Sequence, residues 1–188
     1  DMACIINLFY GDTESDYNSE LIALDGKGIG GKNQSILVNL ESEIKTVKDL
    51  EGKTISVPIG SSAHRMLLEF LKKNNLLESV NIVHQDTPTA CNMVVTGKVD
   101  AVAAWEPYPS AMKYENKMVE LISGAETGNT YLAGVVADSD WIESHKHIFE
   151  IFMECIEESH DFMKKYPDKS IQIICDESSF PSDVVSTV

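Results

Sequence analysis

The middle of the chain switches repeatedly between strand-like and helix-like patterns of hydrophobic residues. The predicted elements are, in order, strand 54–58, helix 61–73, strand 80–85, helix 88–96 and strand 101–105. This order is typical of a parallel sheet covered by helices, so the sequence predicts an α/β fold. Ligands bind where such strands end, which here is at residues 60–64, 85–88 and 105–108.

Further elements are predicted on both sides of this segment. They are strands 21–24, 35–40, 118–122 and 131–138, and helices 109–116 and 147–166. The helix over 147–166 is long and amphipathic, with an apolar stripe that runs from Ile148 to Tyr166. Asp1–Phe9 has the pattern of a buried strand with no turn before it. This pattern predicts that the chain begins in the middle of a lobe.

Residues 25–33 are rich in glycine, with a spacing superficially similar to that of a dinucleotide-binding loop. Such a loop must lie between a strand and a helix, because the helix amino terminus holds the phosphate. Here the following residues 35–40 are strand-like. We therefore predict a mobile glycine-rich loop and no nucleotide site.

Composition excludes several classes of function. The 188 residues suffice for one domain or two small lobes with a core, and they carry a formal net charge of −15. This acidic balance argues against nucleic-acid binding, which needs a basic face, and against binding to an anionic membrane surface. No apolar run approaches the roughly 20 residues of a membrane span. The cysteines, Cys4, Cys91, Cys155 and Cys175, show no CxxC spacing, which disfavours a zinc ribbon or a redox motif.

Two groups of candidate binding residues follow predicted strands, namely Gly60, Ser61, Ser62 and His64 after the first, and Trp105, Glu106 and Tyr108 after the third. The free backbone N–H groups at a helix start attract a negative or strongly accepting group. Serine hydroxyls and the histidine ring add further hydrogen bonds there. The aromatic residues of the second group supply a flat apolar wall with polar tips, which suits closure over a small ligand.

Both groups also have ordinary structural explanations. Ser61 or Ser62 would cap a helix without any ligand, and Trp105 would be a core aromatic residue. Catalysis has less support, because the chain has no Gly-x-Ser-x-Gly elbow. His145 and His147 are two residues apart, a spacing that does not place both on one helical face for a metal. We predict no catalytic residue, no metal and no cofactor.

Five motifs carry a resemblance to a known family, namely residues 47–58 (VKDLEGKTISVP), 60–64 (GSSAH), 97–101 (GKVDA), 105–108 (WEPY) and 133–137 (AGVVA). In this order and spacing, the chain resembles the substrate-binding proteins of ABC importers. The resemblance is to the members that bind sulfonates, taurine, nitrate, bicarbonate and thiamine-precursor pyrimidines. It extends from residue 1 to about residue 178.

The resemblance implies a two-lobed, type II periplasmic-binding-protein fold. Residues 1–34 would belong to lobe 1, residues 35–123 to lobe 2, and residues 124–188 would return to lobe 1. It also implies that the first β-α units of lobe 1 are missing before Asp1. The ligand would lie in the cleft between the lobes. There His64 matches a histidine that contacts the anion in nitrate- and bicarbonate-type members, and residues 106–108 match the family's Glu-Pro-aromatic sequence. Gly134, in the matching motif 133–137, is a further candidate binding residue.

The ligand class is less sharply defined than the fold. Arg65 is the only arginine, and its position need not face the cleft. A sulfonate therefore lacks an arginine suited to grip it, which leaves a neutral or heteroaromatic ligand open.

We expect a monomeric solute-binding subunit that binds a small organic or oxyanionic molecule and presents it to an ABC permease in the membrane. Its location would be extracytoplasmic, either periplasmic or anchored at the cell surface as a lipoprotein. Two alternatives stay open. One is a ligand-sensing domain of a receptor kinase or regulator, and the other is a cofactor-biosynthesis enzyme on the same fold, which would need a base in the cleft.

Overall fold

The computed structural model describes residues 19–28, 31–128 and 131–187. The strand predicted over Asp1–Phe9 lies outside these residues, as does Cys4. The chain divides into two compact units. Unit 1 comprises residues 1–27 and 132–186, and unit 2 comprises residues 28–131 together with the last two residues.

Unit 2 is built on one mixed sheet of five strands. In sequence order these are β2 (Gln34–Asn39), β3 (Thr54–Val57), β4 (Asn81–His84), β5 (Ala101–Trp105) and β6 (Met118–Ser123). Their spatial order is β4-β3-β5-β2-β6. Strand β3 runs parallel to both β4 and β5, which confirms the predicted parallel β-α-β-α-β arrangement. Strand β2 lies antiparallel between β5 and β6 and extends the sheet on that side.

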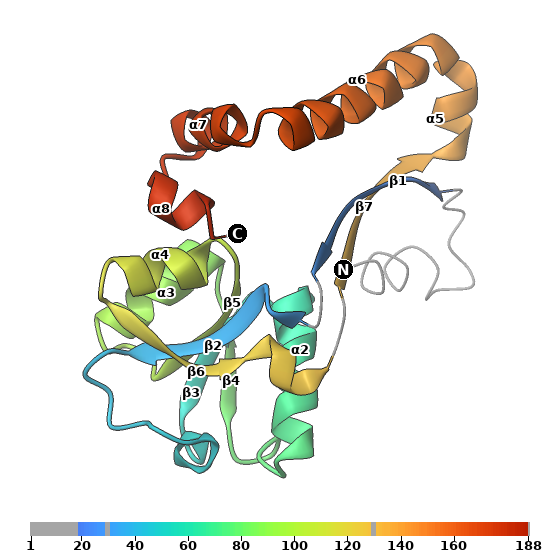
Figure 1. Ribbon diagram of the computed structural model, residues 1–188. Helices are drawn as coiled ribbons and strands as arrows, with labels where there is room; N and C mark the ends of the chain where they lie inside the picture. The colour runs from blue at the N-terminus through green and yellow to red at the C-terminus, as the bar shows by residue number, and fades with distance from the viewer. Residues whose placement is uncertain (1–18, 29–30, 129–130, 188) are drawn as a thin grey trace. The chain divides into compact units, whose positions relative to one another are not determined.

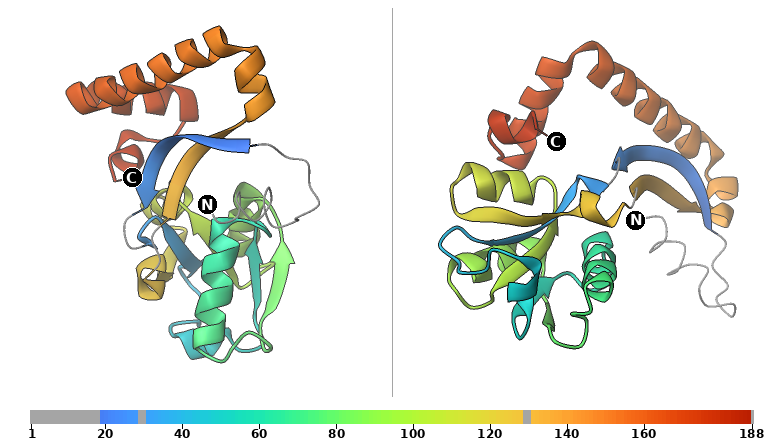
Figure 2. Two further views of the ribbon diagram at one scale, coloured as in Figure 1. Left: turned by 90° about the vertical axis from the view of Figure 1, so that its right-hand side faces the viewer. Right: turned by 60° about the horizontal axis from the view of Figure 1, so that its bottom comes forward.

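Helices cover both faces of this sheet (Figure 1). They are α2 (Ser62–Lys73) on one face and α3 (Thr87–Val95) with α4 (Tyr108–Tyr114) on the other, and the 3-10 turns η2 (Val47–Leu50) and η3 (Gly124–Thr127) complete the unit. Figure 2 shows the same three layers from two other directions. The helices cross between parallel strands, which a hairpin turn cannot connect.

Each face of the sheet carries its own hydrophobic cluster. Side chains alternate along a strand, so Ile36 packs on the α2 face while its neighbour Leu37 packs on the α3 and α4 face. Leu67 and Leu71 of α2 are fully buried against the first cluster. Burial of one such side chain contributes roughly 1.5–3 kcal/mol, so these residues hold α2 and its amino terminus against the sheet.

The described residues of unit 1 form two paired strands and four helices. Its elements are β1 (Ser19–Gly28), β7 (Tyr131–Asp138), α5 (Ser139–Ser144), α6 (Lys146–Lys165), α7 (Pro167–Ser178) and α8 (Ser182–Val185). Ser139 Oγ donates a hydrogen bond of 2.8 Å to Glu20 Oε1, which ties the start of α5 to β1. None of the helices in the described part of the chain combines the length and apolar character that a membrane crossing requires.

One expectation for unit 1 needs correction. Strand β1 continues through Gly28, so residues 25–28 are strand and not part of a glycine-rich loop. Glycine is a weak strand former, but here a strand far along the sequence, β7, supplies the hydrogen-bonded partner. The long helix expected over 147–166 is present as α6, and its apolar stripe is partly exposed. Ile148 is 53% exposed and Phe152 is 44% exposed, and no described residue of α6 is buried.

Candidate functional site

The amino terminus of α2 is shaped by a tight turn that follows β3. The N–H group of Ser61 donates to the carbonyl oxygen of Pro58 at 3.2 Å. Gly60 adopts a φ of +87°, in the left-handed region that side-chain-bearing residues disfavour. A Cβ at this position would meet no atom within 4 Å, so backbone conformation and not space explains the glycine. The turn places Ser61 at the N-cap of α2.

Ser61 caps the helix as its structural explanation predicts. Its backbone is extended, and its Oγ accepts a 3.2 Å hydrogen bond from the N–H group of His64. The N–H groups of Ser62 and Ala63 lie in the first turn, where no helical carbonyl precedes them to accept a hydrogen bond. These N–H groups carry the partial positive charge of the helix start. The cap engages only the N–H group of His64, so those of Ser62 and Ala63 remain able to bind an acceptor.

The His64 ring is held in one protonation pattern. The N–H group of Gly60 donates to His64 Nδ1 at 3.2 Å, so Nδ1 acts as an acceptor. In the neutral ring the proton then resides on Nε2, which becomes a donor. Burial lowers the pKa of His64 below its ordinary value, which favours this neutral form.

A residue outside the predicted set, Gln34, lies against the same helix start. Its side chain is 1% exposed, and its Nε2 donates a 2.6 Å hydrogen bond to Ser62 Oγ. Gln34 also pairs in register with Trp105 on the neighbouring strand. Both side chains lie on the α2 face of the sheet, since Gln34 alternates with Ile36 and Trp105 packs against the same cluster. The sequence signal was a polar residue two positions before the apolar run Ile36–Val38.

The second predicted group is divided between the two faces of the sheet. Trp105 packs on the α2 face, whereas Tyr108 packs against the cluster beneath α3 and α4. There Tyr108 lines a shallow pocket with Cys91 and Met112. Glu106 Oε2 accepts a 3.0 Å hydrogen bond from the N–H group of Ser110 at the start of α4. Trp105 is therefore the member of this group that shares a face with the Ser61 turn.

The remaining predicted position, Gly134, lies within β7 of unit 1. Arg65 forms an ion pair with Glu69 along the exposed side of α2, with 3.0 Å between Arg65 Nε and Glu69 Oε1. Among the described residues, no three His, Cys, Asp or Glu side chains gather in an arrangement that could hold a metal ion.

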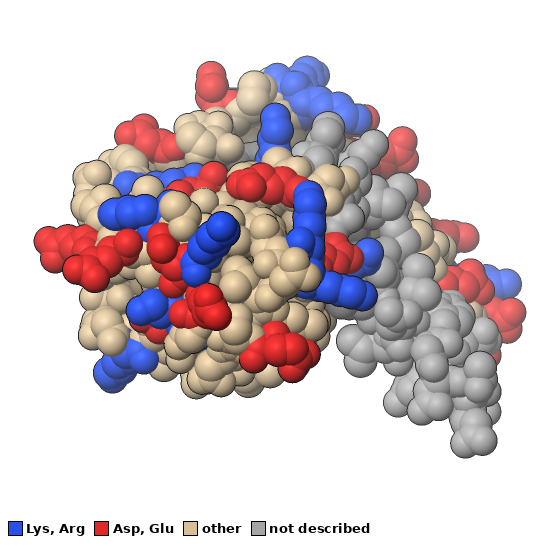
Figure 3. Space-filling model, turned by 90° about the horizontal axis from the view of Figure 1, so that it is seen from below, with Lys and Arg blue, Asp and Glu red and all other residues tan. Residues whose placement is uncertain are grey.

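Charges of both signs lie together on one face of the molecule. Figure 3 shows Lys and Arg side chains interspersed with Asp and Glu side chains across one face, without a large area of one sign. The net charge of the chain is −15, so the overall field repels a small anion. Attraction of an anion therefore depends on local donors such as those at the start of α2.

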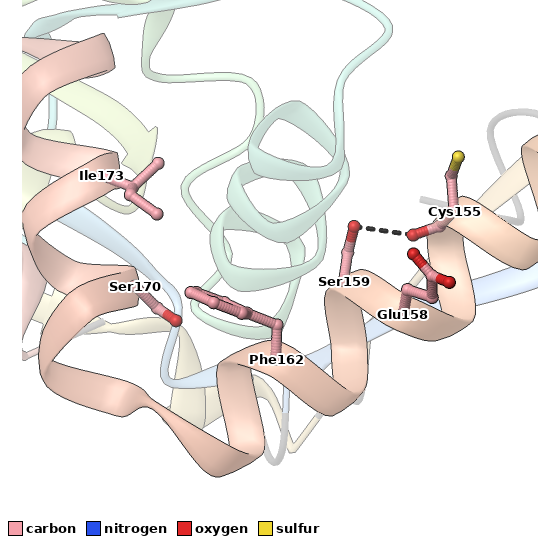
Figure 4. Close-up of a pocket in the computed structure, with 6 residues that line it drawn as sticks. All are labelled: Cys155, Glu158, Ser159, Phe162, Ser170 and Ile173. Carbon is pink, nitrogen blue, oxygen red and sulfur yellow. Dashed lines mark hydrogen bonds between the residues drawn. The ribbon is translucent and has the colours of Figure 1, made fainter.

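A second hollow lies in unit 1, between α6 and α7 (Figure 4). Its lining is mostly apolar, with Phe162 and Ile173 facing the space. The two serine hydroxyls of the lining donate to carbonyl oxygens of their own helices, Ser159 to Cys155 at 2.7 Å and Ser170 to Tyr166 at 2.9 Å. A ligand site needs a few convergent polar groups, so this hollow is a weaker candidate than the start of α2.

Solved structures share the fold over nearly the whole chain. The alkanesulfonate-binding protein SsuA from Xanthomonas axonopodis pv. citri, bound to MOPS, matches with a TM-score of 0.79 and 24% identity, over 98% of this chain and 62% of that one. SsuA from Escherichia coli matches with a TM-score of 0.76 and 22% identity, over 98% and 62% of the two chains. The desulfurization enzyme DSZB matches with a TM-score of 0.68 and 14% identity, over 96% of this chain and 65% of the DSZB chain.

Curated relatives agree with these structures. A candidate ABC transporter periplasmic binding protein of Brachyspira hyodysenteriae is 28% identical over 84% of this chain and 49% of its own length. A candidate aliphatic sulfonates-binding protein of Escherichia coli is 28% identical over 83% of this chain and 49% of its own length. One of Bacillus subtilis is 29% identical over 91% of this chain and 55% of its own length. The chain thus spans about half the length of the curated relatives it matches.

The structural matches confirm the predicted fold class, an α/β fold of the two-lobed periplasmic-binding-protein type. The family model described as NMT1/THI5 like matches residues 26–170, which is more than half of the chain. The chain belongs to the NMT1/THI5-like family.

Proposed function

We propose that this chain is the ligand-binding part of the solute-binding subunit of an ABC importer, and that it binds a small molecule with a sulfonate or similar oxyanionic group. The observation that carries the proposal is the start of α2. There the N–H groups of Ser62 and Ala63, the serine hydroxyls and His64 Nε2 form a set of hydrogen-bond donors. Such a set holds an anion without an arginine, because the helix start itself favours negative charge.

The names of the relatives support this ligand class. Two curated relatives are named for aliphatic sulfonates, and a structure with the same fold was solved with MOPS bound. The apolar part of such a molecule would rest on Trp105, which shares the α2 face with Gln34.

Binding explains this site better than catalysis does. A nucleophilic serine needs a base that accepts its proton. Here Ser61 Oγ accepts from the backbone of His64, and His64 Nδ1 accepts from the backbone of Gly60, so neither atom is arranged as part of a nucleophile–base pair. We therefore propose a binding role, although DSZB shows that the fold is also used by an enzyme.

The proposal extends to partners and location. A solute-binding subunit delivers its ligand to a membrane permease, so we propose an ABC permease as partner and an extracytoplasmic location. We also propose that the subunit acts as a monomer. Ligand binding would then shift a population between conformations, which the permease distinguishes.

Isothermal titration calorimetry with propanesulfonate, MOPS, nitrate and an aminopyrimidine tests the proposal. We expect the sulfonates to bind, and Ser62→Ala to weaken binding by about tenfold, since a hydrogen bond to a charged group contributes about 1.5–3 kcal/mol. Ser79→Ala is the matched control, because Ser79 donates to Leu76 near the far end of α2. Absence of heat from all four ligands, or an equal loss in both variants, would contradict the proposed function.

A further inference from the structure

We propose that Gln34 is a positioning residue that occupies one lone pair of Ser62, directs the hydroxyl proton elsewhere, and so biases the site toward an accepting group over a donating one. The inference rests on the proposed function, because it concerns the group of the ligand that meets Ser62. It adds a residue that none of the predicted motifs contains, and a physical basis for discrimination between ligands of the same shape.

The geometry starts with the short contact between Gln34 Nε2 and Ser62 Oγ, at 2.6 Å. A serine hydroxyl has one proton and two lone pairs. When a lone pair accepts from Gln34, the proton of Ser62 points elsewhere. Among the described residues, Ser62 Oγ has no other hydrogen-bond partner, and Ser62 is only partly buried. Its proton is thus free to meet a ligand oxygen.

The orientation of the Gln34 amide is set by the cost of the alternative. In the orientation observed, Oε1 of Gln34 is buried without a partner while Nε2 is used. Exchange of the two atoms would leave the amide NH₂ group, with its two donors, buried without a partner. Buried donors without a partner are rarer in proteins than under-satisfied carbonyl oxygens, so the observed orientation is the favoured one. The burial of Gln34 also prevents the amide from turning to water.

The neighbouring groups have the same polarity. Ser61 Oγ accepts from the N–H group of His64, which leaves its own proton free to donate. His64 Nδ1 accepts from Gly60, which leaves Nε2–H as a donor. A protein donor thus uses the one accepting nitrogen of His64 and one of the two lone pairs of each serine. Ser61, Ser62 and His64 therefore each keep a proton to donate, whereas a ligand N–H group would find only the one remaining lone pair of each serine.

The test compares two ligands of nearly equal shape, propanesulfonate and propanesulfonamide. The sulfonamide replaces one oxygen by an NH₂ group, so it offers donors and lacks the charge. We expect the wild-type chain to prefer the sulfonate. Gln34→Met keeps the length and burial of the side chain but cannot donate, so both lone pairs of Ser62 become free and its hydroxyl can turn to accept from the ligand. We expect this variant to reduce the preference by about tenfold, a loss typical of one hydrogen bond to a charged group.

A double-mutant cycle separates positioning from general damage. If Gln34 acts through Ser62, Gln34→Met should change the preference in the wild type but not in the Ser62→Ala background. Gln34→Glu is a second variant that is nearly isosteric. The carboxylate of Gln34→Glu accepts from the Ser62 hydroxyl, which turns the lone pairs of Ser62 toward the ligand. We therefore expect this variant to prefer the sulfonate over the sulfonamide even less than Gln34→Met does. Gln34→Glu also provides the test of the inference if Gln34→Met does not fold.

Three results are distinguishable. Failure of the wild-type chain to bind either ligand would overturn the proposed function and this inference together. Sulfonate binding with an unchanged preference in both Gln34 variants would overturn only the inference. Additive effects of Gln34→Met and Ser62→Ala would also overturn it, because they would show that Gln34 affects the ligand by a route other than Ser62.

Discussion

Replacement of Ser61 by Asp should separate its capping role from its proposed ligand-binding role. Asp caps a helix about as well as Ser, and a negative charge at a helix start adds about 0.3–1 kcal/mol of stability. The same carboxylate would lie among the donors at the start of α2, where a ligand oxyanion is proposed to bind. We therefore expect a chain that is at least as stable as the wild type but binds a sulfonate poorly.

The size of the binding loss follows from the charge separation. Two like charges about 4 Å apart repel by about 1 kcal/mol in bulk water and by about 4 kcal/mol at an effective dielectric of 20. The affinity for propanesulfonate should accordingly fall between about fivefold and about a thousandfold. Ser61→Ala is the matched comparison. It loses the side-chain acceptor for the N–H group of His64, which costs about 1 kcal/mol and lowers the melting temperature by about 2–4 °C.

The assay combines calorimetry with thermal unfolding followed by tryptophan fluorescence. The chain has two tryptophans, Trp105 in unit 2 and Trp141 in unit 1. Trp141 is 43% exposed, so a Trp141→Phe background should be tolerated and leaves Trp105 as the reporter for unit 2. Ligand-free melting curves then give the capping effect, and titrations give the binding effect.

Two results would each contradict one part of this prediction. If Ser61→Asp bound propanesulfonate as tightly as the wild type, the anion would not lie at the start of α2. A melting temperature of Ser61→Asp as low as that of Ser61→Ala would show separately that the cap was lost, because an effective cap keeps the helix start stable.

Three other predictions concern stability and reactivity. Leu67→Ala should lower the free energy of unfolding by about 2–5 kcal/mol in chemical unfolding, because Leu67 is fully buried. Val119→Ala, at a position 38% exposed, should lower it much less, and equal decreases would contradict the assigned core. Burial raises the pKa of Cys91 to about 11, so iodoacetamide at pH 8 should label exposed Cys155 well before Cys91 in peptide mass spectrometry, and equal rates would be inconsistent with this. Burial lowers the pKa of His64 in the folded chain, so near the ordinary pKa of histidine the unfolded chain binds more protons than the folded chain. The free energy of unfolding should therefore decrease as the pH falls through this pKa, and it should decrease less in His64→Gln. Identical pH profiles of stability in the two proteins would contradict the lowered pKa.

The elements of unit 2 follow closely from local patterns. Strand β5 occupies residues 101–105, the range expected from its run of small and branched apolar residues. The Ser61 cap was also predictable, because a serine before a helical pattern is a local signal. Strand β1 was placed less well, since its extension through Gly28 depends on pairing with distant β7. Local propensity contains no information about such a partner.

The candidate site shows the same division between local and distant information. The residues Gly60–His64 are adjacent in sequence, so their shared role at a helix start could be predicted. Gln34 contacts Ser62 across 28 positions of sequence, and no local pattern links the two. Tyr108 lies three residues after Trp105, but the chain turns between them and places their side chains on opposite faces of the sheet. Their closeness in sequence therefore suggested that both side chains cover one ligand, whereas the structure places them on different faces of the sheet.

The central claim is that an accepting group of the ligand binds the N–H groups at the start of α2. The most direct test is amide-resolved NMR of the isotope-labelled chain, titrated with propanesulfonate. We expect the amide signals of Ser62 and Ala63 to shift downfield and to saturate together, while that of Ser79 stays in place. Saturable shifts confined to residues around the hollow between α6 and α7, such as Phe162 and Ile173, with no change at Ser62 and Ala63, would contradict it.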